Sequence, residues 1–269
     1  MEEHLKFAKS LAREAGEIMR KYFNQAEINH HYKADNTIVT TADEEINQMV
    51  IDRVREEYPD HGVYGEEDSF GRDKSILWVC DPVDGTAMFA RGVPTAVFSL
   101  ALVEDGAPKL GVVYDPFTDR LYSAAKDQGA FCNDAPMHVN QTPLDDKSAV
   151  SNFDIWPDAG TFDETQSLIM VLYQETYLVS LGSCINACMQ VARGAFVTEV
   201  FSGTVGKNVD IAAAKIIVEE AGGRVTNIYG EEQRYDRDIL GAIVSNGVVH
   251  DEIINLIKEA NNVEKRDRD

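Results

Sequence analysis

Two acidic residues follow a short apolar segment, and their spacing suits a metal site. Residues 76–81, ILWVCD, are typical of a buried strand, and the turn-rich sequence DPVDGT places Asp81 and Asp84 at its end. Two carboxylates on a rigid turn can point at one spot, and such hard oxygen donors suit Mg²⁺. Gly85 and Thr86 then offer backbone N–H groups to an anion. DPVDGT alone fits an ordinary turn equally well, because Asp-Pro and Asp-Gly are common turn formers.

Three further acids stand at the ends of expected elements. Glu66 lies in GEED ahead of a polar loop, Asp43 lies in the first turn of an expected helix over 42–58, and Asp210 starts a helix in VDIAAAKIIVEEAGG. Each has an ordinary explanation, since carboxylates cap helices and complement the helix dipole. Taken singly, none of these acids indicates a site.

Composition limits the classes of partner. The 269 residues carry a formal net charge of −21, which disfavours binding to nucleic acid. No stretch reaches the roughly 20 apolar residues of a membrane span, and the start MEEHLKFAKS lacks the apolar core of a signal peptide. We therefore expect a cytoplasmic protein without membrane contact. The four cysteines form no CxxC pair, so buried free thiols are favoured over a zinc site.

The surrounding pattern predicts layers of helices and sheets. Apolar residues recur at helical spacing over 3–23, and Thr41 with Glu44 fits a capping box for the second helix. A meander of strands follows the acidic turn, and β and α units alternate in the second half. The segment near 140–150 is the weakest part of the pattern. We accordingly expect an N-terminal part, 1–145, that carries the metal motifs, and a C-terminal part, 146–269, that completes the site.

Taken together, the motifs are specific. The order GEE, WVCDPVDGT and VDIAAAKIIVEEAGG, at these separations, resembles the inositol monophosphatase family, and the resemblance covers nearly the whole chain. It implies an α/β fold, an αβαβα sandwich of the inositol monophosphatase and fructose-1,6-bisphosphatase type. It also implies a homodimer and two or three Mg²⁺ ions per site. Lithium inhibition, common in the family, is a possibility.

The resemblance also implies a role for each site residue. The implied metal ligands are Glu66, Asp81, the backbone carbonyl of Val83, Asp84 and Asp210. A weaker third ion would be held through water near Glu66, with Asp43 nearby. The implied catalytic residues are Thr86 and Asp43, which would orient the attacking water, and Asp84, which would help to protonate the leaving group. The implied substrate contacts are Gly85 and Thr86 through their N–H groups, Asp84 and, as an alternative to a plain surface acid, Glu199.

Some positions depart from the family pattern. Ala87-Met88 stands where TN is common, Thr37 where an Asp often lies, and Val179 where an Arg is usual. The loop 200–208 looks longer than usual, and Val209 replaces a common Trp. None of these departures removes an implied metal ligand. All of them lie where the family positions or packs around its substrate.

These features predict a Mg²⁺-dependent phosphomonoesterase that releases phosphate from a small polyol or sugar phosphate, with inositol monophosphate as the first candidate. The alternatives on the same scaffold are a fructose-1,6-bisphosphatase, a histidinol-phosphatase and a 3′-phosphonucleotide phosphatase. A non-catalytic relative with a binding or regulatory role is a further alternative. The complete carboxylate set argues against it, because such a cluster is costly without metal.

Overall fold

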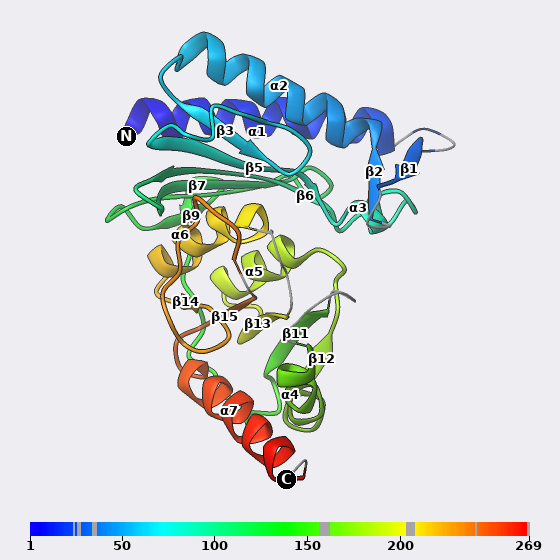
Figure 1. Ribbon diagram of the computed structural model, residues 1–269, viewed down its shortest axis with the longest axis vertical. Coiled ribbons are helices and arrows are strands. Elements are labelled where there is room, and N and C mark those ends of the chain that lie inside the picture. The colour runs from blue at the N-terminus through cyan, green and yellow to red at the C-terminus, as the bar shows by residue number, and fades with distance from the viewer. Residues whose placement is uncertain are drawn as a thin grey trace.

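The computed structural model of the protein describes residues 1–23, 25, 28–33, 37–155, 162–202, 208–239 and 241–267. Its helices are α1 (Glu2–Phe23), α2 (Thr41–Glu57), α3 (Thr86–Phe89), α4 (Phe162–Glu175), α5 (Cys184–Ala192), α6 (Ala212–Glu220), α7 (His250–Asp267) and the 3₁₀ turn η1 (Asn208–Asp210). Together with two sheets they form five layers in the order α-β-α-β-α (Figure 1). The predicted αβαβα fold is therefore confirmed.

The first sheet has eight strands in the order β10-β9-β8-β7-β6-β5-β3-β4. Its strands are β3 (Gly62–Gly65), β4 (Ser69–Phe70), β5 (Ile76–Asp84), β6 (Val97–Glu104), β7 (Ala107–Asp115), β8 (Arg120–Ala125), β9 (Ala130–Cys132) and β10 (Ala135–Pro136). The pair β3 and β5 is parallel and the other neighbours are antiparallel. A separate hairpin joins β1 (His30–Tyr32) to β2 (Ile38–Thr40). The carboxyl ends of β3 and β5 thus meet at one edge.

The second sheet has five strands in the order β12-β11-β13-β15-β14. These are β11 (Val150–Ile155), β12 (Tyr177–Val179), β13 (Thr198–Ser202), β14 (Arg224–Thr226) and β15 (Ala242–Ser245). Strand β11 is parallel to both of its neighbours, whereas β15 is antiparallel to β13 and β14. This sheet uses residues 150–245 and the first uses 62–136, while the division at 145/146 stays a prediction.

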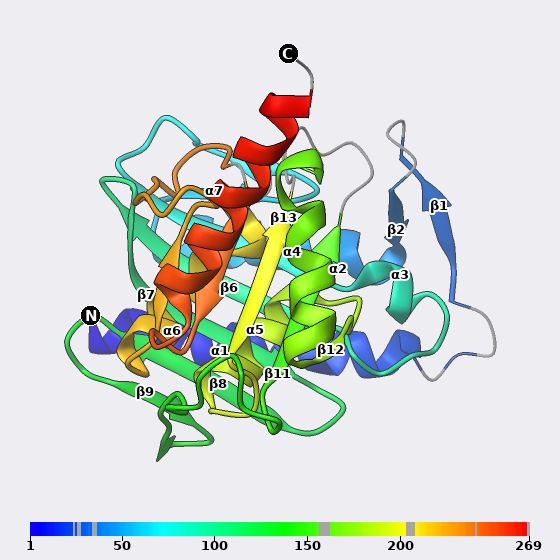
Figure 2. The same ribbon diagram turned by 90° about the horizontal axis from the view of Figure 1, so that it is seen from below.

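Three hydrophobic clusters hold the layers together. Helices α1 and α2 cover the outer face of the first sheet, and helices α5 and α6 fill the space between the sheets. Helices α4 and α7 lie side by side on the far face of the second sheet (Figure 2). The apolar stripe of α1 explains its place, because Leu11, Ala12 and Ala15 are fully buried at helical spacing. Burial of these apolar faces determines how each helix packs, and it thereby sets the positions of the acidic residues at the helix ends.

Three local details differ from the sequence-based expectation. The capping pair of α2 is Thr40 with Asp43, one residue before the predicted Thr41 and Glu44, because the helix buries Ala42 and Asp43 and exposes Thr41 and Glu44. Strand β5 does not end at Asp81 but continues to Asp84. Asp210 lies in the turn η1 just before α6 rather than in the helix itself.

Candidate active site

The end of β5 carries two buried carboxylates across a β-bulge. Asp81 is opposite Ser99 and Asp84 is opposite Val97, so β5 has an extra stretch between these two pairs. A bulge of this kind re-aims side chains that would otherwise alternate strictly. The Val83 amide donates a 3.0 Å hydrogen bond to Asp81 Oδ1, which fixes that carboxylate against the bulge. Asp81 is 2% exposed and Asp84 is 7% exposed.

Thr86 and Asp43 are in direct contact, although 43 residues separate them in the chain. The Thr86 hydroxyl lies 3.1 Å from Asp43 Oδ1 and 2.8 Å from the Val83 carbonyl oxygen, and it can donate to one of them at a time. The amide and the hydroxyl of Thr40 both donate to the other oxygen of Asp43. The structure therefore brings together the two residues predicted to orient the attacking water.

Burial leaves the Asp43 carboxylate with an unusual affinity for protons. Its side chain has no exposed surface, and burial raises the pKa of Asp43 to about 7. The charge of Glu66 adds to this rise, whereas the hydrogen bonds from Thr40 oppose it. A carboxylate with a pKa near neutrality can exchange a proton in the physiological range.

Asp84 connects the first sheet to the start of helix α5. Its Oδ2 accepts hydrogen bonds from the Ser183 hydroxyl and, at 2.9 Å, from the Ile185 amide, and its Oδ1 lies 3.5 Å from the Cys184 sulfur. Burial raises the pKa of Asp84 to about 6 against these donors. The sequence motifs did not predict the contacts of Ser183 and Cys184, because about 100 residues separate them from Asp84.

Gly85 is required where these segments meet. Its φ of +86° lies in the left-handed region, and a Cβ there would lie 2.9 Å from the Cβ of Ser183. A side chain would thus be strained in its backbone and would also collide with the α5 turn. The glycine predicted to bind phosphate has this packing reason as well.

Glu66 and Asp210 approach the same region from two other elements. Glu66 follows β3, and its amide donates a 3.1 Å hydrogen bond to the Cys80 carbonyl oxygen, next to Asp81. Asp210 is 4% exposed in η1, which packs against β5 and β6. Burial raises the pKa of the Cys184 thiol, and the charges of Asp84 and Asp210 add to that rise, so both carboxylates lie near this sulfur.

A lysine that the sequence analysis did not single out also contacts this region. Lys33 Nζ lies 2.6 Å from Glu67 Oε1 and 3.6 Å from Glu66 Oε1. It is the last described residue of the segment that includes β1. The signal in the sequence was weak, because a lysine in a polar loop is usually just solvated.

Glu199 lies apart from the solvent in the middle of the second sheet. It is fully buried on β13, beside Asn152 of β11 in the parallel register. Burial raises the pKa of Glu199 well above its ordinary value, and the nearby Asp154 adds to this. Its predicted contact with substrate hydroxyls stays a prediction, and an exposed surface acid is excluded.

The donor set fits Mg²⁺, although it does not form a ready-made cage. Within the described part of the chain, no three histidine, cysteine or acidic side chains converge as a complete ligand group. The hydrogen bonds show why, because Asp84 is held by the turn before α5 and Asp43 by Thr40. All of the candidate side-chain donors are nevertheless hard carboxylate oxygens, and the raised pKa values of Asp43 and Asp84 show a site that a cation would stabilise.

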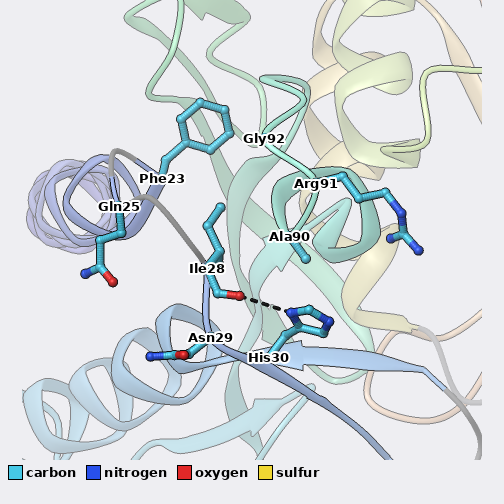
Figure 3. A pocket seen from close by; sticks show the side chains of 8 residues that line it. All are labelled: Phe23, Gln25, Ile28, Asn29, His30, Ala90, Arg91 and Gly92. Atoms are coloured by element: carbon cyan, nitrogen blue, oxygen red, sulfur yellow. Dashed lines mark hydrogen bonds between the residues drawn. The ribbon is translucent and has the colours of Figure 1, made fainter.

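A cavity of about 490 Å³ lies elsewhere, beyond the far end of α3. Its lining residues are Phe23, Gln25, Ile28, Asn29, His30, Ala90, Arg91 and Gly92 (Figure 3). None of the candidate catalytic or metal-binding residues lines it. The side chain of Arg91 points away from His30 in this view, so the polar groups do not converge on one ligand position.

Comparison with known proteins identifies the family. Residues 1–262 match the inositol monophosphatase family. The chain belongs to this family. A fructose-1,6-bisphosphatase/inositol-1-monophosphatase from Thermotoga maritima is 32% identical over 96% of both chains. A histidinol-phosphatase from Mycobacterium tuberculosis is 30% identical over 94% of this chain and 96% of its own. Nus factor SuhB from Pasteurella multocida is 33% identical over 86% of this chain and 87% of its own.

Solved structures agree with this family membership. The IMPase from Thermotoga maritima superposes with a TM-score of 0.85 at 31% identity. The match covers 97% of this chain and 98% of that one. An IMPase/NADP phosphatase solved with Mg²⁺ and phosphate has a TM-score of 0.79 at 26% identity over 93% of both chains. The relatives therefore share the fold but bear the names of several different phosphatases and of one Nus factor.

Proposed function

We propose that this inositol monophosphatase family member is a Mg²⁺-dependent phosphomonoesterase that acts on a small polyol or sugar phosphate. The observation that carries the proposal is the direct contact between the Thr86 hydroxyl and the buried Asp43 carboxylate at the end of β5. The residues that would hold two or three Mg²⁺ ions are Glu66, Asp81, Val83 through its carbonyl, Asp84 and Asp210. Bound Mg²⁺ would neutralise the phosphate dianion and activate water toward it.

The chain's own groups would position the reactants. Because the Thr86 hydroxyl donates its hydrogen to Asp43 or to Val83, its oxygen can accept a hydrogen bond from a water. The neighbouring Asp43 carboxylate would accept a proton from that water. The backbone N–H groups of Gly85 and Thr86 would bind the phosphate, and Asp84 would help to return a proton to the leaving alcohol.

Inositol monophosphate is the first candidate substrate, and the named relatives support fructose 1,6-bisphosphate and histidinol phosphate as alternatives. A 3′-phosphonucleotide is a further one. Met88 packs against the turn that carries Ser183; a Cβ on Gly182 would lie 2.7 Å from its Cγ. We propose that this apolar side chain also lines the alcohol side of the substrate site, which would favour broad specificity. An apolar lining separates related substrates only about 10–200-fold, unlike a lining that hydrogen-bonds hydroxyls.

The test is a substrate panel in millimolar Mg²⁺, with phosphate release as the measurement. The panel contains inositol 1-phosphate, glycerol 2-phosphate, fructose 1,6-bisphosphate, histidinol phosphate and adenosine 3′,5′-bisphosphate. Asp81→Asn, purified in parallel, controls for a contaminating phosphatase. We expect several substrates with kcat/KM values within about 200-fold of one another. One substrate ahead by about 10⁴ would refute the broad specificity and identify the physiological class.

A regulatory role without catalysis is the second candidate, because a Nus factor is 33% identical to the chain. Its signature would be a chain that binds Mg²⁺ but hydrolyses no member of the panel.

Homodimer formation and a cytoplasmic location complete the proposal. Light scattering should give about twice the 29.9 kDa mass of one chain. Within the described residues, no helix has the length and apolar character to cross a membrane.

A further inference from the structure

One segment of the second sheet reaches across the molecule to the first. It joins β14 to β15, and Figure 1 shows it in orange, rising from the five-stranded sheet toward the eight-stranded one. The Tyr235 amide donates a 2.9 Å hydrogen bond to the carbonyl oxygen of Gly106, in the turn between β6 and β7. The Tyr235 side chain is 1% exposed, so this crossing is a packed contact.

The same segment forms a hydrogen bond with a residue just before Glu66. The Tyr64 hydroxyl donates a 2.6 Å hydrogen bond to Asp238 Oδ1, and the Arg72 guanidinium lies 3.8 Å from the centre of the Tyr64 ring. Tyr64 precedes Glu66 by two residues on β3, the strand parallel to β5.

The segment between β14 and β15 also forms a hydrogen bond with a residue just before Asp210. Asn208 Nδ2 donates a 2.8 Å hydrogen bond to the carbonyl oxygen of Tyr235, and Asn208 is fully buried in η1. Asn208 precedes Asp210 by two residues. Within four residues, the segment 235–238 therefore bonds to the Tyr64 side chain, two residues before the proposed ligand Glu66, and to the Asn208 side chain, two residues before the proposed ligand Asp210.

We infer that residues 235–238 act as a strap that sets the spacing between Glu66 and Asp210, with Tyr64, Asn208 and Asp238 as positioning residues for the Mg²⁺ site. This inference rests on the proposed function. Glu66 follows β3 of the first sheet, whereas Asp210 lies in η1 just ahead of α6, in the helical layer between the sheets, so small shifts between these layers would otherwise change their separation. Mg²⁺ demands near-ideal octahedral geometry and tolerates such shifts poorly. Residues beyond the direct ligands commonly change metal affinity about 10–100-fold.

The test is calorimetric titration of the full chain with Mg²⁺ alone, without substrate. Asp238→Ala and Tyr64→Phe each remove one partner of the 2.6 Å hydrogen bond. Each should raise the Kd for Mg²⁺ about 10-fold, and the double variant should be no worse than either single one. Asp238→Asn keeps an acceptor oxygen and should restore a Kd close to that of the unaltered chain.

A matched control comes from the same segment. Asp236→Ala removes a carboxylate that pairs with Arg234 rather than with Tyr64. It should leave the Kd for Mg²⁺ unchanged. A positioning role also predicts that kcat recovers at saturating Mg²⁺ in Asp238→Ala, whereas a general loss of structure would lower kcat and the melting temperature without restoring either.

The outcomes separate the two proposals. Failure of the unaltered chain to bind Mg²⁺ would overturn the proposed function, and the strap's role in metal binding would fall with it. Binding by the unaltered chain, with Kd values in folded Tyr64→Phe and Asp238→Ala within about 2-fold of it, would overturn the strap alone. A 10-fold loss in Asp236→Ala as well would also overturn it, because the effect would then not depend on the Tyr64 contact.

Discussion

The buried carboxylates Asp43 and Asp81 differ in their hydrogen-bond partners and in the role proposed for each in metal binding. Asp43 is hydrogen-bonded by Thr40 and Thr86, so its carboxylate is satisfied by neutral donors. Asp81 receives a hydrogen bond from the Val83 amide and lies on β5 directly after Cys80, the last residue of β5 that pairs with β3. We propose that Asp81 is a ligand shared by both principal metal ions, as the family resemblance implies. The two acids should therefore respond differently to the same isosteric change.

We predict that Asp81→Asn loses more activity than Asp43→Asn. Removing a ligand shared by two ions should cost several kcal/mol of transition-state stabilisation, a rate loss on the order of 10³ or more. Asp43→Asn keeps its shape and should lose less. The measurement is kcat at saturating Mg²⁺ for both variants on the best substrate of the panel. A kcat for Asp81→Asn within a few-fold of the unaltered chain would show that the assigned roles are wrong.

Protons should compete with Mg²⁺ at these carboxylates. In the metal-free chain the pKa of Asp84 is raised from 3.8 to about 6 and that of Asp43 to about 7. Mg²⁺ binds the deprotonated forms, so the Kd for Mg²⁺ should rise on the order of 10–100-fold between pH 8 and pH 5.5. Titrations in two buffers of different ionisation enthalpy would count the protons released. A Kd independent of pH would contradict these pKa assignments.

The same shifts have the opposite effect on the stability of the metal-free chain. An acid whose pKa is higher in the folded chain than in the unfolded one binds protons more tightly when folded. The contribution of Asp43 and Asp84 to the free energy of unfolding should therefore increase as the pH falls from about 7 toward 3.8. Mg²⁺ binding and metal-free stability thus have different pH dependences, which separates the two measurements.

At the scale of elements, local patterns predicted most helices and strands but not their mutual contacts. The apolar stripe predicted over 3–23 depends only on neighbouring residues, and helix α1 confirms it. The bond between Ser183 and Asp84 spans 99 residues, so no local pattern could reveal it. The bulge in β5 was missed because proline and Asp-Gly also signal a turn. The parallel β3 was not anticipated, since four residues carry little periodicity.

Helix α7 begins at a histidine that links it to two strands. Both ring nitrogens of His250 form hydrogen bonds with hydroxyl groups. Nδ1 lies 2.8 Å from Ser245 Oγ on β15, and Nε2 lies 2.9 Å from Thr226 Oγ1 on β14. His250 is fully buried, and burial lowers its pKa from 6.5 to about 4. The unfolded chain therefore binds this proton more tightly than the folded chain. The stability that comes from a neutral His250 is complete above pH 6.5 and is lost as the pH falls toward 4.

We predict that this histidine costs the metal-free chain about 2 kcal/mol of unfolding free energy between pH 7 and pH 5. His250→Gln removes the titration, so the difference in unfolding free energy between the two chains should shrink by that amount over the same range. Urea unfolding in chelator at several pH values measures it. Taking the difference cancels the opposite contributions of Asp43 and Asp84. Parallel pH profiles for the two chains would refute this role for His250.

At the scale of the whole molecule, the site lies where the two sheets meet across α5 and α6. Asp43, Asp81 and Asp84 come from the first sheet and its helices, whereas Asp210 lies in η1 and Ser183 caps α5, both in the helical layer between the sheets. The ligand identities taken from the sequence motifs stay predictions, and no motif could show that Asp84 is held by α5 or that Tyr64 bonds to Asp238. These contacts depend on how the layers stack, which no single segment encodes.

A cation bound between the layers should therefore stabilise the entire fold. We predict that Mg²⁺ raises the melting temperature through mass action, by about 2.7 kcal/mol of unfolding free energy at 100 times its Kd. For a chain of this size that corresponds to a shift of roughly 5–10 °C. Chelator should reverse the shift, and Asp81→Asn should abolish most of it.

The net charge of −21 requires a control for this measurement, because any salt screens repulsion among exposed carboxylates. Potassium chloride at matched ionic strength reproduces that screening without a divalent ion. A specific site predicts that Mg²⁺ exceeds potassium chloride in the unaltered chain and equals it in Asp81→Asn. Equal shifts for both salts in the unaltered chain would mean that the acids act only through the overall charge, and the proposed metal site would then have to be abandoned.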